Sequence, residues 1–358
     1  MQTLQKQNTF SVLNDVNKNQ INYQNHRNTG IELKYHRLSL GYGNWNQWWG
    51  PGIHNSLTLS NNSEGFYHYF VGNNKYIQLN KSISYKVRYL VSDKIKNELD
   101  ANFYLSALFF NVRYDKIELG YSRNILSGGY PDIKWDISNA IWSMFTNKNL
   151  KYWDTINDYY LKLNLQESGL EIFVNIGFPN RQFNGKDEDV YSDHSMGSNL
   201  GFRKKGFFDN NNLEYGFEYT RLVQGIYYNI IPTSNWYDNI KYNYHSYNQR
   251  RWAAHSGSDS DDLLIYFGYG DSLKRLIFGL NYERHGVSYH FPPEVKIESK
   301  ISFSHKYKNT IISIDYENEY FEHYAFVDKS INVWKETFEE GSIQRTKTIL
   351  FSITSILN

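Results

Sequence analysis

The chain has 358 residues and a formal net charge of +1, so no strong overall charge favours nucleic acid or an acidic partner. Aromatic residues make up 18% of it, with 32 Tyr, 22 Phe and 9 Trp, although the mean hydropathy is −0.65. A soluble domain rarely needs so many rings while it stays so polar, whereas a transmembrane β-barrel combines aromatic girdles with a polar lumen.

Three absences from the sequence narrow the possible classes of protein. It contains no cysteine, which excludes thiolate metal sites and thiol catalysis. It contains no run of eighteen apolar residues, so helical membrane spans are excluded. The N-terminus lacks the apolar stretch of a signal peptide, which an outer-membrane protein requires. Either the chain begins inside a longer precursor or a membrane location is wrong; we expect a chain that lacks its signal peptide and first strands.

The most distinctive stretch of the sequence, at 44–62, joins three tryptophans to a Gly-Pro-Gly turn. The glycines permit backbone angles that other residues avoid, and the proline between them fixes φ, so a rigid turn is predicted. Three indoles at one turn suit a sugar-stacking platform or a ring at a membrane interface. The alternative is an aromatic cluster that packs the end of a hairpin. After this turn, alternating small and apolar residues predict a strand over 56–62.

Alternation of apolar and polar residues predicts long β-strands along most of the chain. The clearest example is 77–89, where the odd positions are apolar apart from Lys81 and the even positions are all polar. We expect the polar side of each such strand to face a lumen and the apolar side to face outward. The same pattern returns at 101–109, 117–121, 159–165, 170–176, 213–219, 276–282, 295–303 and 312–320.

A soluble β-sandwich also fits this alternation, but two features favour a membrane barrel. The strands run about ten residues or more, against a usual length of about five or six. Short turns alternate with long polar connections at 180–198, 225–238 and 325–341, as periplasmic turns alternate with extracellular loops. The predicted fold class is all-β: a large antiparallel transmembrane β-barrel of about 16–18 strands, forming one domain over 1–358.

One region, 132–153, interrupts the rhythm of strands. Within it, 137–145 reads as a short helix with Ile137, Ile141 and Phe145 on one side. A helical insertion at this place predicts a plug in the lumen or a cap on one end of the barrel.

Together with the strand pattern, the Trp-Trp-Gly-Pro-Gly motif at 48–52 and the run at 56–62 resemble the signature of the capsule assembly Wzi family. The segments 255–261, 282–286 and 292–294 resemble elements of its Bacteroidetes branch. The resemblance covers most of the chain from about residue 30 onward. It implies an outer-membrane barrel with helical material blocking the lumen. It also implies a lectin-like role, in which the protein binds capsular polysaccharide and holds the capsule at the cell surface without being an enzyme.

Binding of an anionic glycan needs aromatic faces for pyranose rings and guanidinium groups for carboxylates. Each arginine has a structural alternative, an ion pair that fills the lumen with Glu118, Glu214 or Asp315, and each tryptophan has one in the barrel wall. By alternation, Arg88 faces the lumen. The residues predicted to bind polysaccharide or to form the motif are Trp45, Trp48, Trp49, Gly50, Pro51, Gly52, Ser56, Asn61, Asn62, Arg88, Arg113, Arg123, Glu283, Arg284 and His285.

The sequence gives weaker signals for metal binding and for catalysis. Asp259, Asp261 and Asp262 have the spacing of calcium ligands, but an acidic surface loop is the preferred interpretation. The Asp-His-Ser run at 193–195 has the residue types of a hydrolytic triad, but sequence neighbours cannot reach its geometry. The Glu-Arg-His run at 283–285 has no assignable nucleophile and is interpreted as a polar strand end. We predict no catalytic residue, no metal ion and no cofactor.

The predicted function is therefore that of a lectin-like protein of the bacterial outer membrane, which binds capsular or extracellular polysaccharide and anchors or assembles the capsule. Its expected partners are that polysaccharide and outer-membrane lipid, with no nucleic acid, and we expect a monomer. A porin or substrate channel is the alternative, although a plugged lumen argues against it. A hydrolase embedded in the barrel is a third hypothesis.

Overall fold

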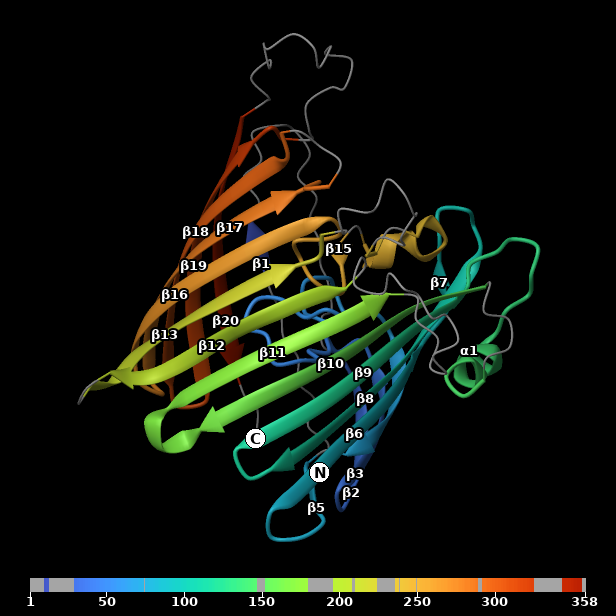
Figure 1. The fold of residues 1–358 in the computed structure, drawn as a ribbon, viewed down its shortest axis with the longest axis horizontal. Helices are drawn as coiled ribbons and strands as arrows, with labels where there is room; N and C mark the ends of the chain where they lie inside the picture. Colours follow the sequence, from blue (N-terminus) through green and yellow to red (C-terminus); the bar gives the residue numbers. More distant parts are fainter. Residues whose placement is uncertain are drawn as a thin grey trace.

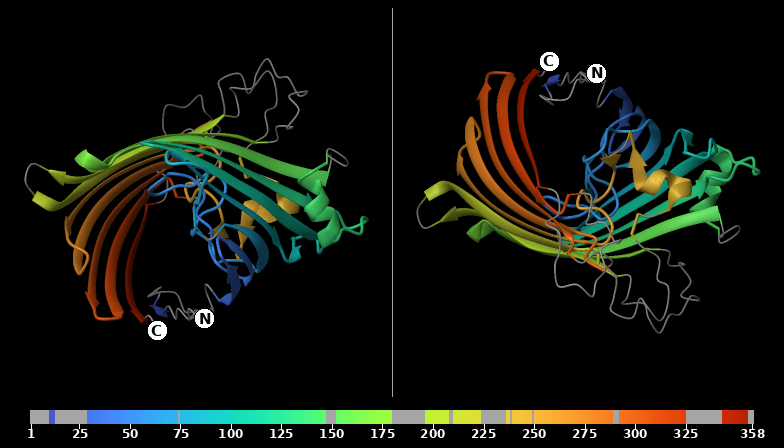
Figure 2. Two further views of the ribbon diagram at one scale, coloured as in Figure 1. Left: turned by 90° about the horizontal axis from the view of Figure 1, so that it is seen from below. Right: turned by 90° about the horizontal axis from the view of Figure 1, so that it is seen from above.

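The computed structural model describes residues 10–12, 29–73, 75–146, 152–179, 196–207, 210–223, 236–237, 239–248, 250–288, 292–324 and 343–355. One antiparallel sheet of 18 strands dominates it and curls around an interior (Figures 1 and 2). Its strands are β1 (Phe10–Val12), β2 (Gly30–Tyr35), β3 (Leu38–Gly43), β4 (His68–Asn73), β5 (Ile77–Gln78), β6 (Ile83–Ser92), β7 (Ile95–Lys96), β8 (Asn102–Tyr114), β9 (Ile117–Gly128), β10 (Trp153–Leu165), β11 (Leu170–Pro179), β12 (Gly197–Phe207), β13 (Asn210–Arg221), β16 (Ser260–Gly270), β17 (Lys274–His285), β18 (Glu294–Tyr307), β19 (Thr310–Glu322) and β20 (Gln344–Ser355).

The strands pair in chain order as a meander. From the edge strand β2 the sheet passes through β3, β4, β6 and β8 to β13, and then through β16 to β20, on whose far side lies β1. The short strands β5 and β7 pair with β6 and β8. Within the described ranges, no pairing joins β1 to β2. Figure 2 shows the blue and red ends of the sheet turning toward each other, so the sheet has the curvature of a barrel wall.

The outer face of the sheet is apolar, as the alternation predicts. In β17, Leu276, Phe278 and Leu280 are exposed on the outside, while Arg275 and Asn281 line a cavity inside. Successive side chains of a strand point to opposite faces, so one apolar row per strand is enough to cover the whole exterior. The same outward row recurs in other strands: Leu38, Leu40, Leu119, Tyr159, Leu161, Ile172, Val174, Ile265, Phe267, Ile297, Ile301, Phe303, Ile314, Ile349, Phe351 and Ile353.

Strand β8 reverses the predicted orientation. Its apolar positions Phe103, Leu105 and Ala107 are fully buried and belong to the interior core, whereas Phe110 on the alternate row is exposed outside. The prediction that this side faces outward is wrong, because the lumen here contains apolar residues of two other segments rather than water. Both faces of β8 are therefore apolar, and alternation cannot tell them apart.

The predicted strand over 77–89 is interrupted. Residues 79–82 form a bend between β5 and β6, because the Asn80 side-chain oxygen accepts hydrogen bonds from the backbone N–H groups of Ser82 (2.9 Å) and Ile83 (2.8 Å). An asparagine that bonds to its own following backbone replaces the ladder by a local turn. The alternation in the sequence continues through this turn and so conceals it.

Two irregular segments fill the interior of the sheet. The first, the inner segment, comprises residues 44–67 between β3 and β4; the second lies between β13 and β16 and includes the 3-10 helix η4 (Ile240–His245) and the two-stranded sheet of β14 (Ser246–Tyr247) and β15 (Arg250–Arg251). Figure 2 shows the inner segment, in blue, running within the curved sheet. Their buried core residues include Trp49, Leu57, Leu59, Phe66, Leu222, Trp236, Tyr237, Tyr242, Trp252, Ala253 and Ala254.

The predicted helix exists but lies outside the sheet. Helix α1 (Ile137–Ser143) packs its Ala140 against Val91 and Tyr104, and the Ser106 hydroxyl donates to the Ala140 carbonyl (2.6 Å). Val91 pairs with the outward-facing Tyr69 in the sheet, so this is the outer face. The expectation of a helical plug in the lumen is wrong: the inner segment takes that place, and it is not helical (Figure 1). No helix in the described ranges is long and apolar enough to cross a membrane.

Candidate functional site

A buried carboxylate anchors the inner segment to the wall. Glu218 of β13 is almost completely buried and accepts backbone N–H groups from Ile53, His54 (3.0 Å) and Asn55 (2.7 Å). Hydrogen bonds to an ionised acceptor are the strong ones, and here they satisfy three donors that no regular secondary structure serves. The turn formed by 50–52 and its neighbours is thereby fixed against β13.

The three tryptophans of the motif occupy different environments. Trp49 is only 3% exposed and packs in the interior core at 5.5 Å from the ring of Phe109. Trp45 meets the ring of Phe70 edge-on at 5.5 Å, while Trp48 is 36% exposed. Trp48 is therefore the motif tryptophan with an accessible face.

The Gly-Pro-Gly turn has a geometry that depends on its glycines, as the sequence predicts. Gly50 has φ of +120°, which L side chains rarely adopt, and a Cβ on Gly52 would collide with the carbonyl of Asn55. The carbonyl of Pro51 accepts a hydrogen bond from the guanidinium of Arg203. The turn therefore lies against the wall with its backbone groups engaged.

The residues after the turn form no strand. The Ser56 hydroxyl donates to the carbonyl of Trp49, and the Asn62 amide donates to the carbonyl of Arg251 (3.0 Å), while Asn61 is exposed. The predicted strand over 56–62 is wrong, because residues 56–60 are buried among interior side chains and are not paired with a neighbouring strand.

The three predicted arginines are not brought together. Arg88 faces the interior, donates to the side chain of Gln47 (3.1 Å) and lies over the ring of Phe70 at 4.4 Å. Arg113 donates to Glu118 (2.7 Å), an ion pair of the kind proposed as the alternative. Lys162 lies 3.4 Å from the same carboxylate.

Arg123 is buried on the row of β9 that also carries Tyr121. That row is the outward one, since Leu119 on it is exposed and Glu118 on the other row faces the interior. Strand alternation therefore separates Arg123 from the other two predicted arginines.

The strand end at 283–285 is divided between the two faces. Glu283 and His285 point inward and lie 3.0 Å apart, while Arg284 points outward and pairs with Asp261 (2.9 Å). The two aspartates of β16 are divided in the same way. Asp261 shares the face of Arg284, and Asp262 is buried in the interior. The interpretation of the run at 259–262 as an acidic surface loop is wrong for the two aspartates of β16, which lie in a strand. The Asp-His-Ser run at 193–195 lies outside the described residues.

Asp262 and Glu283 meet two histidines that the sequence analysis did not select. The Nε2 atom of His255 lies 3.0 Å from Glu283 and 3.5 Å from Asp262, and the ring of His54 meets that of His255 at 3.9 Å between centroids. Burial by itself lowers the pKa of His255, but the charge and hydrogen bond of Glu283 and the charge of Asp262 together outweigh burial and raise that pKa to about 9. Burial and the neighbouring His255 hold the pKa of His54 well below its usual value.

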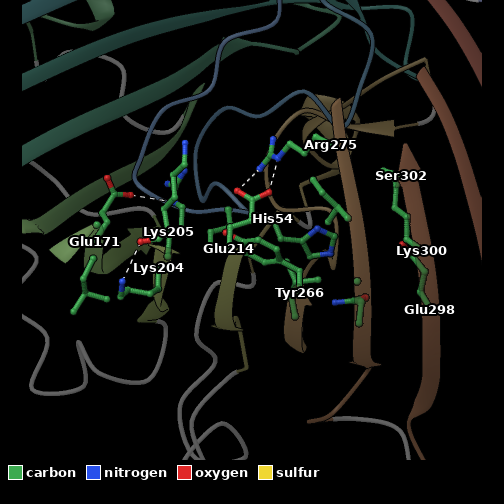
Figure 3. A pocket seen from close by; sticks show the side chains of 18 of the residues that line it. His54, Glu171, Lys204, Lys205, Glu214, Tyr266, Arg275, Glu298, Lys300 and Ser302 are labelled. Carbon is green, nitrogen blue, oxygen red and sulfur yellow. Dashed lines mark hydrogen bonds and ion pairs between the residues drawn. The ribbon is translucent and has the colours of Figure 1, made fainter. Parts of the chain in front are cut away.

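A cavity of about 520 Å³ lies near the short turns, between the inner segment and the wall (Figure 3). We call it the turn-side cavity. Its lining includes the bidentate pair of Arg275 with Glu214, the aromatic side chain of Tyr266, and His54. The lining carries five basic and three acidic side chains, so the cavity favours an anion modestly. The charged residues are Arg203, Lys204, Lys205, Arg275 and Lys300, against Glu171, Glu214 and Glu298.

A second cavity, of about 390 Å³, lies at the other end, in the long connection between β13 and β16. We call it the loop-side cavity. Tyr244, with 40% exposure, and the exposed Arg250 face it. Three consecutive residues here have positive φ, namely Asn243 (50°), Tyr244 (55°) and His245 (55°). Such strain in non-glycine residues concentrates at functional sites. The lining consists of Asn62, Tyr244, Ser246, Arg250, Arg251 and His255.

Of the residues predicted from sequence, Asn62 lies at the loop-side cavity, and Tyr244, Arg250 and Arg251 were missed. A signal was present: the paired arginines precede Trp252 in a connection that is rich in tyrosine. Alternating aromatic and basic residues in a long connection are a pattern for ligand contact that strand periodicity does not capture.

Comparison with known proteins finds similarity at the level of structure. No protein-family model matches the sequence, and no curated protein matches it. The structure is similar to that of Wzi from Escherichia coli, described as an outer-membrane protein involved in group 1 capsule assembly and as a carbohydrate-binding β-barrel. The TM-score is 0.66 at 12% identity, over 93% of this chain and 71% of that one.

Two further structures align at lower scores. They are OccAB4 of Acinetobacter baumannii (TM-score 0.47, 10% identity, over 91% of this chain and 73% of that one) and OpdQ of Pseudomonas aeruginosa (TM-score 0.45, 9% identity, over 90% and 79%). Since both scores lie below 0.5, the fold assignment rests on the E. coli structure. At 12% identity that likeness is one of fold, and the chain has a Wzi-like fold.

Proposed function

We propose that this protein is a transmembrane β-barrel of the bacterial outer membrane that binds capsular or other extracellular polysaccharide and holds it at the cell surface. The observation that carries the proposal is the loop-side cavity, where an exposed tyrosine and two arginines converge above a filled lumen. The Wzi-like fold supports it, since the E. coli protein is described as a carbohydrate-binding barrel.

Insertion in a membrane is supported by the wall. Strands β8, β10 and β19 have 13 residues and β18 has 14, against about 9–11 needed to cross a bilayer as a tilted strand. An apolar outer row runs along nearly every strand, and such a surface is costly in water but favourable in lipid. A lipid-exposed sheet must also close on itself, so β1 or β20 is expected to reach β2 in the membrane.

The position of the loop-side cavity supports contact with an external polymer. In outer-membrane barrels short turns face the periplasm and long connections face outside. The turns at 36–37, 115–116 and 271–273 are short and lie at one end, whereas the connection from β13 to β16 lies at the other. The loop-side cavity therefore faces the exterior, and the turn-side cavity faces the periplasm.

The chemistry of the loop-side cavity fits an acidic sugar. The ring of Tyr244 offers a flat face to a pyranose, and the exposed guanidinium of Arg250 offers paired donors to a carboxylate. Asn62 and Ser246 add polar groups for hydroxyls. The exposed motif tryptophan, Trp48, is a second candidate for stacking, while assignment to the Bacteroidetes branch remains a prediction from sequence.

The test is retention of polysaccharide by living cells. Deletion of the gene in the organism that carries it is expected to shed polymer that the wild type keeps cell-bound. Complementation with Tyr244→Ala/Arg250→Ala is expected to restore a correctly inserted barrel without restoring retention. Arg37→Ala is the matched control, because Arg37 is exposed in the turn between β2 and β3 at the opposite end.

Two results would contradict the proposal. If polymer stays cell-bound without the gene, the anchoring function is wrong, and the alternative of a channel is examined by conductance in a planar bilayer. If the double variant retains polymer as well as Arg37→Ala does, the loop-side cavity is not the binding site.

A further inference from the structure

Four metal-ligating side chains from four different parts of the chain converge in the interior. His54 belongs to the inner segment, His255 to the connection before β16, Asp262 to β16 and Glu283 to β17. Asp262 and Glu283 are register partners, so two carboxylates stand directly opposite each other on the interior face. Like charges in that position repel each other, so a cation close to both carboxylates is favourable.

We propose that His54, His255, Asp262 and Glu283 bind one divalent transition-metal ion of the Zn²⁺ type, which clamps the inner segment to the barrel wall. The ligating atoms all lie within 4.8 Å of one another. A tetrahedral site with bonds of about 2.0–2.1 Å needs donor separations of about 3.3 Å. The separations of His255 from Glu283 (3.0 Å) and from Asp262 (3.5 Å) already fit, and His54 lies 3.9 Å from Asp262.

The carboxylates are held in place by outer partners, as in established metal sites. Asn55 donates to Asp262 (2.6 Å), and Asn281 donates to its other oxygen. His285 lies 3.0 Å from the second oxygen of Glu283, which leaves the first oxygen directed at His255.

The backbones of the two histidines are also fixed. The N–H group of His54 donates to Glu218 (3.0 Å), and that of His255 donates to the Asn55 side chain (3.1 Å). Little rearrangement is needed to close the site.

One atom of the cluster points to a ligand. The Nε2 atom of His54 is buried and has no hydrogen-bond partner in the described part of the chain, although burial of an unpartnered polar atom is costly. A metal bond would satisfy it. His54 also lines the turn-side cavity and His255 lines the loop-side cavity, so the cluster lies between the two cavities.

The donor set selects the class of metal. Two imidazoles favour zinc and neighbouring first-row ions over Ca²⁺ and Mg²⁺, which prefer all-oxygen sites. The two carboxylates balance a divalent charge. Lys296 lies 3.2 Å from Glu283 and also pairs with Glu298 (2.9 Å) and Glu319 (3.1 Å). It therefore keeps two carboxylate partners when Glu283 binds the metal.

The experiment uses tag-free full-length protein in detergent, stripped with EDTA and dialysed against ZnCl₂. We expect one zinc per chain by elemental analysis, and visible d–d bands of a tetrahedral site when Co²⁺ replaces Zn²⁺. His54→Gln is the principal variant. The Nε2 atom of His54 has no hydrogen-bond partner in the described part of the chain, so its removal breaks no hydrogen bond there. His54→Gln/His255→Gln is expected to weaken zinc binding at least about 100-fold, and the outer-partner variant His285→Gln about 10-fold.

The control variant His36→Gln/His323→Gln removes two histidines at other sites, next to β2 and after β19, and is expected to bind zinc as the wild type does. Heat-modifiable migration on gels confirms in each case that the barrel is folded. Failure of the folded wild type to bind zinc stoichiometrically would overturn the proposal. So would unchanged binding by His54→Gln/His255→Gln, which would move the ion to the carboxylates Glu298, Glu317 and Glu319.

Discussion

Glu218 shows how one buried side chain can organise a segment that has no regular structure. Its carboxylate faces three backbone donors of the inner segment and the side chain of Asn199 (3.1 Å), which balances the cost of burying a charge. An acidic residue at this position in an interior row is therefore structural. It explains how a sequence of turns and small residues at 50–56 is held in one conformation.

Replacement of Glu218 by glutamine is expected to destabilise the protein by about 3 kcal/mol, because an amide NH₂ would face the N–H groups of Ile53 and His54 where an oxygen now accepts. The measurement is the urea midpoint for loss of the heat-modifiable form. Glu214→Gln is the matched control on the same interior row, since Glu214 pairs with Arg275 and not with the inner segment. We expect a change below about 1 kcal/mol there; equal losses in both variants would contradict the anchoring role.

At the scale of elements, the position of α1 departs most from the sequence interpretation. Ala140 and Ser143 are its buried residues and Ile137 packs beside them, whereas Ile141 and Phe145 of the predicted row are exposed. Large apolar side chains of a helix normally face the core, but here the helix lies on an apolar outer wall. A small alanine allows close contact with that wall, while Ile141 and Trp142 stay exposed and the ring of Phe145 lies 6.0 Å from that of Tyr89.

Trp142 of α1 is 63% exposed beside the exposed Phe145, an arrangement typical of an aromatic anchor at a membrane interface. In protein reconstituted with brominated lipid, we expect the fluorescence of Trp142 to be quenched. This quenched component should be missing from Trp142→Phe. Trp252→Phe is the control, because Trp252 is buried in the interior core and should contribute fluorescence that lipid does not quench. Absence of quenching at Trp142 would place α1 above the bilayer.

At the scale of the whole molecule, the inner segment distinguishes an anchor from a channel. Leu57, Leu59 and Trp49 pack with Trp236 and Trp252 across the interior, which leaves an apolar barrier where a channel needs water. The two cavities lie on either side of the cluster of His54 and His255, one facing the turns and the other facing the loops. Wild-type protein is therefore expected to be electrically silent in a planar bilayer.

Removal of the inner segment is expected to open the lumen. Gly43 and His68 are register partners, so residues 44–67 can be replaced by a short hairpin turn without changing the wall. The shortened barrel should show conductance steps that the wild type lacks. Steps of equal size in both proteins would contradict a filled lumen and favour the channel hypothesis.

Some strands could be predicted correctly from the sequence and others could not, and the difference has a physical reason. Alternation at 276–282 and 295–303 predicted strands and their outward rows correctly, since the outer environment is uniformly apolar. It was wrong for 101–109, because the interior there is apolar as well. Of the predicted site, Asn62 reached a cavity, whereas Trp49 is in the core and Arg113 is in an ion pair.

The sequence by itself determined the class of the sheet, the apolar exterior and the rigid turn at 50–52, because period-two alternation and Gly-Pro-Gly geometry are local properties of the chain. Only the tertiary structure decided which segments enter the interior, where α1 packs, and which charged groups meet. His54 and Glu283 are 229 positions apart in sequence, and no local pattern relates them. Their meeting depends on the register of β16 with β17 and on the path of the inner segment through the lumen, which the whole curved sheet sets.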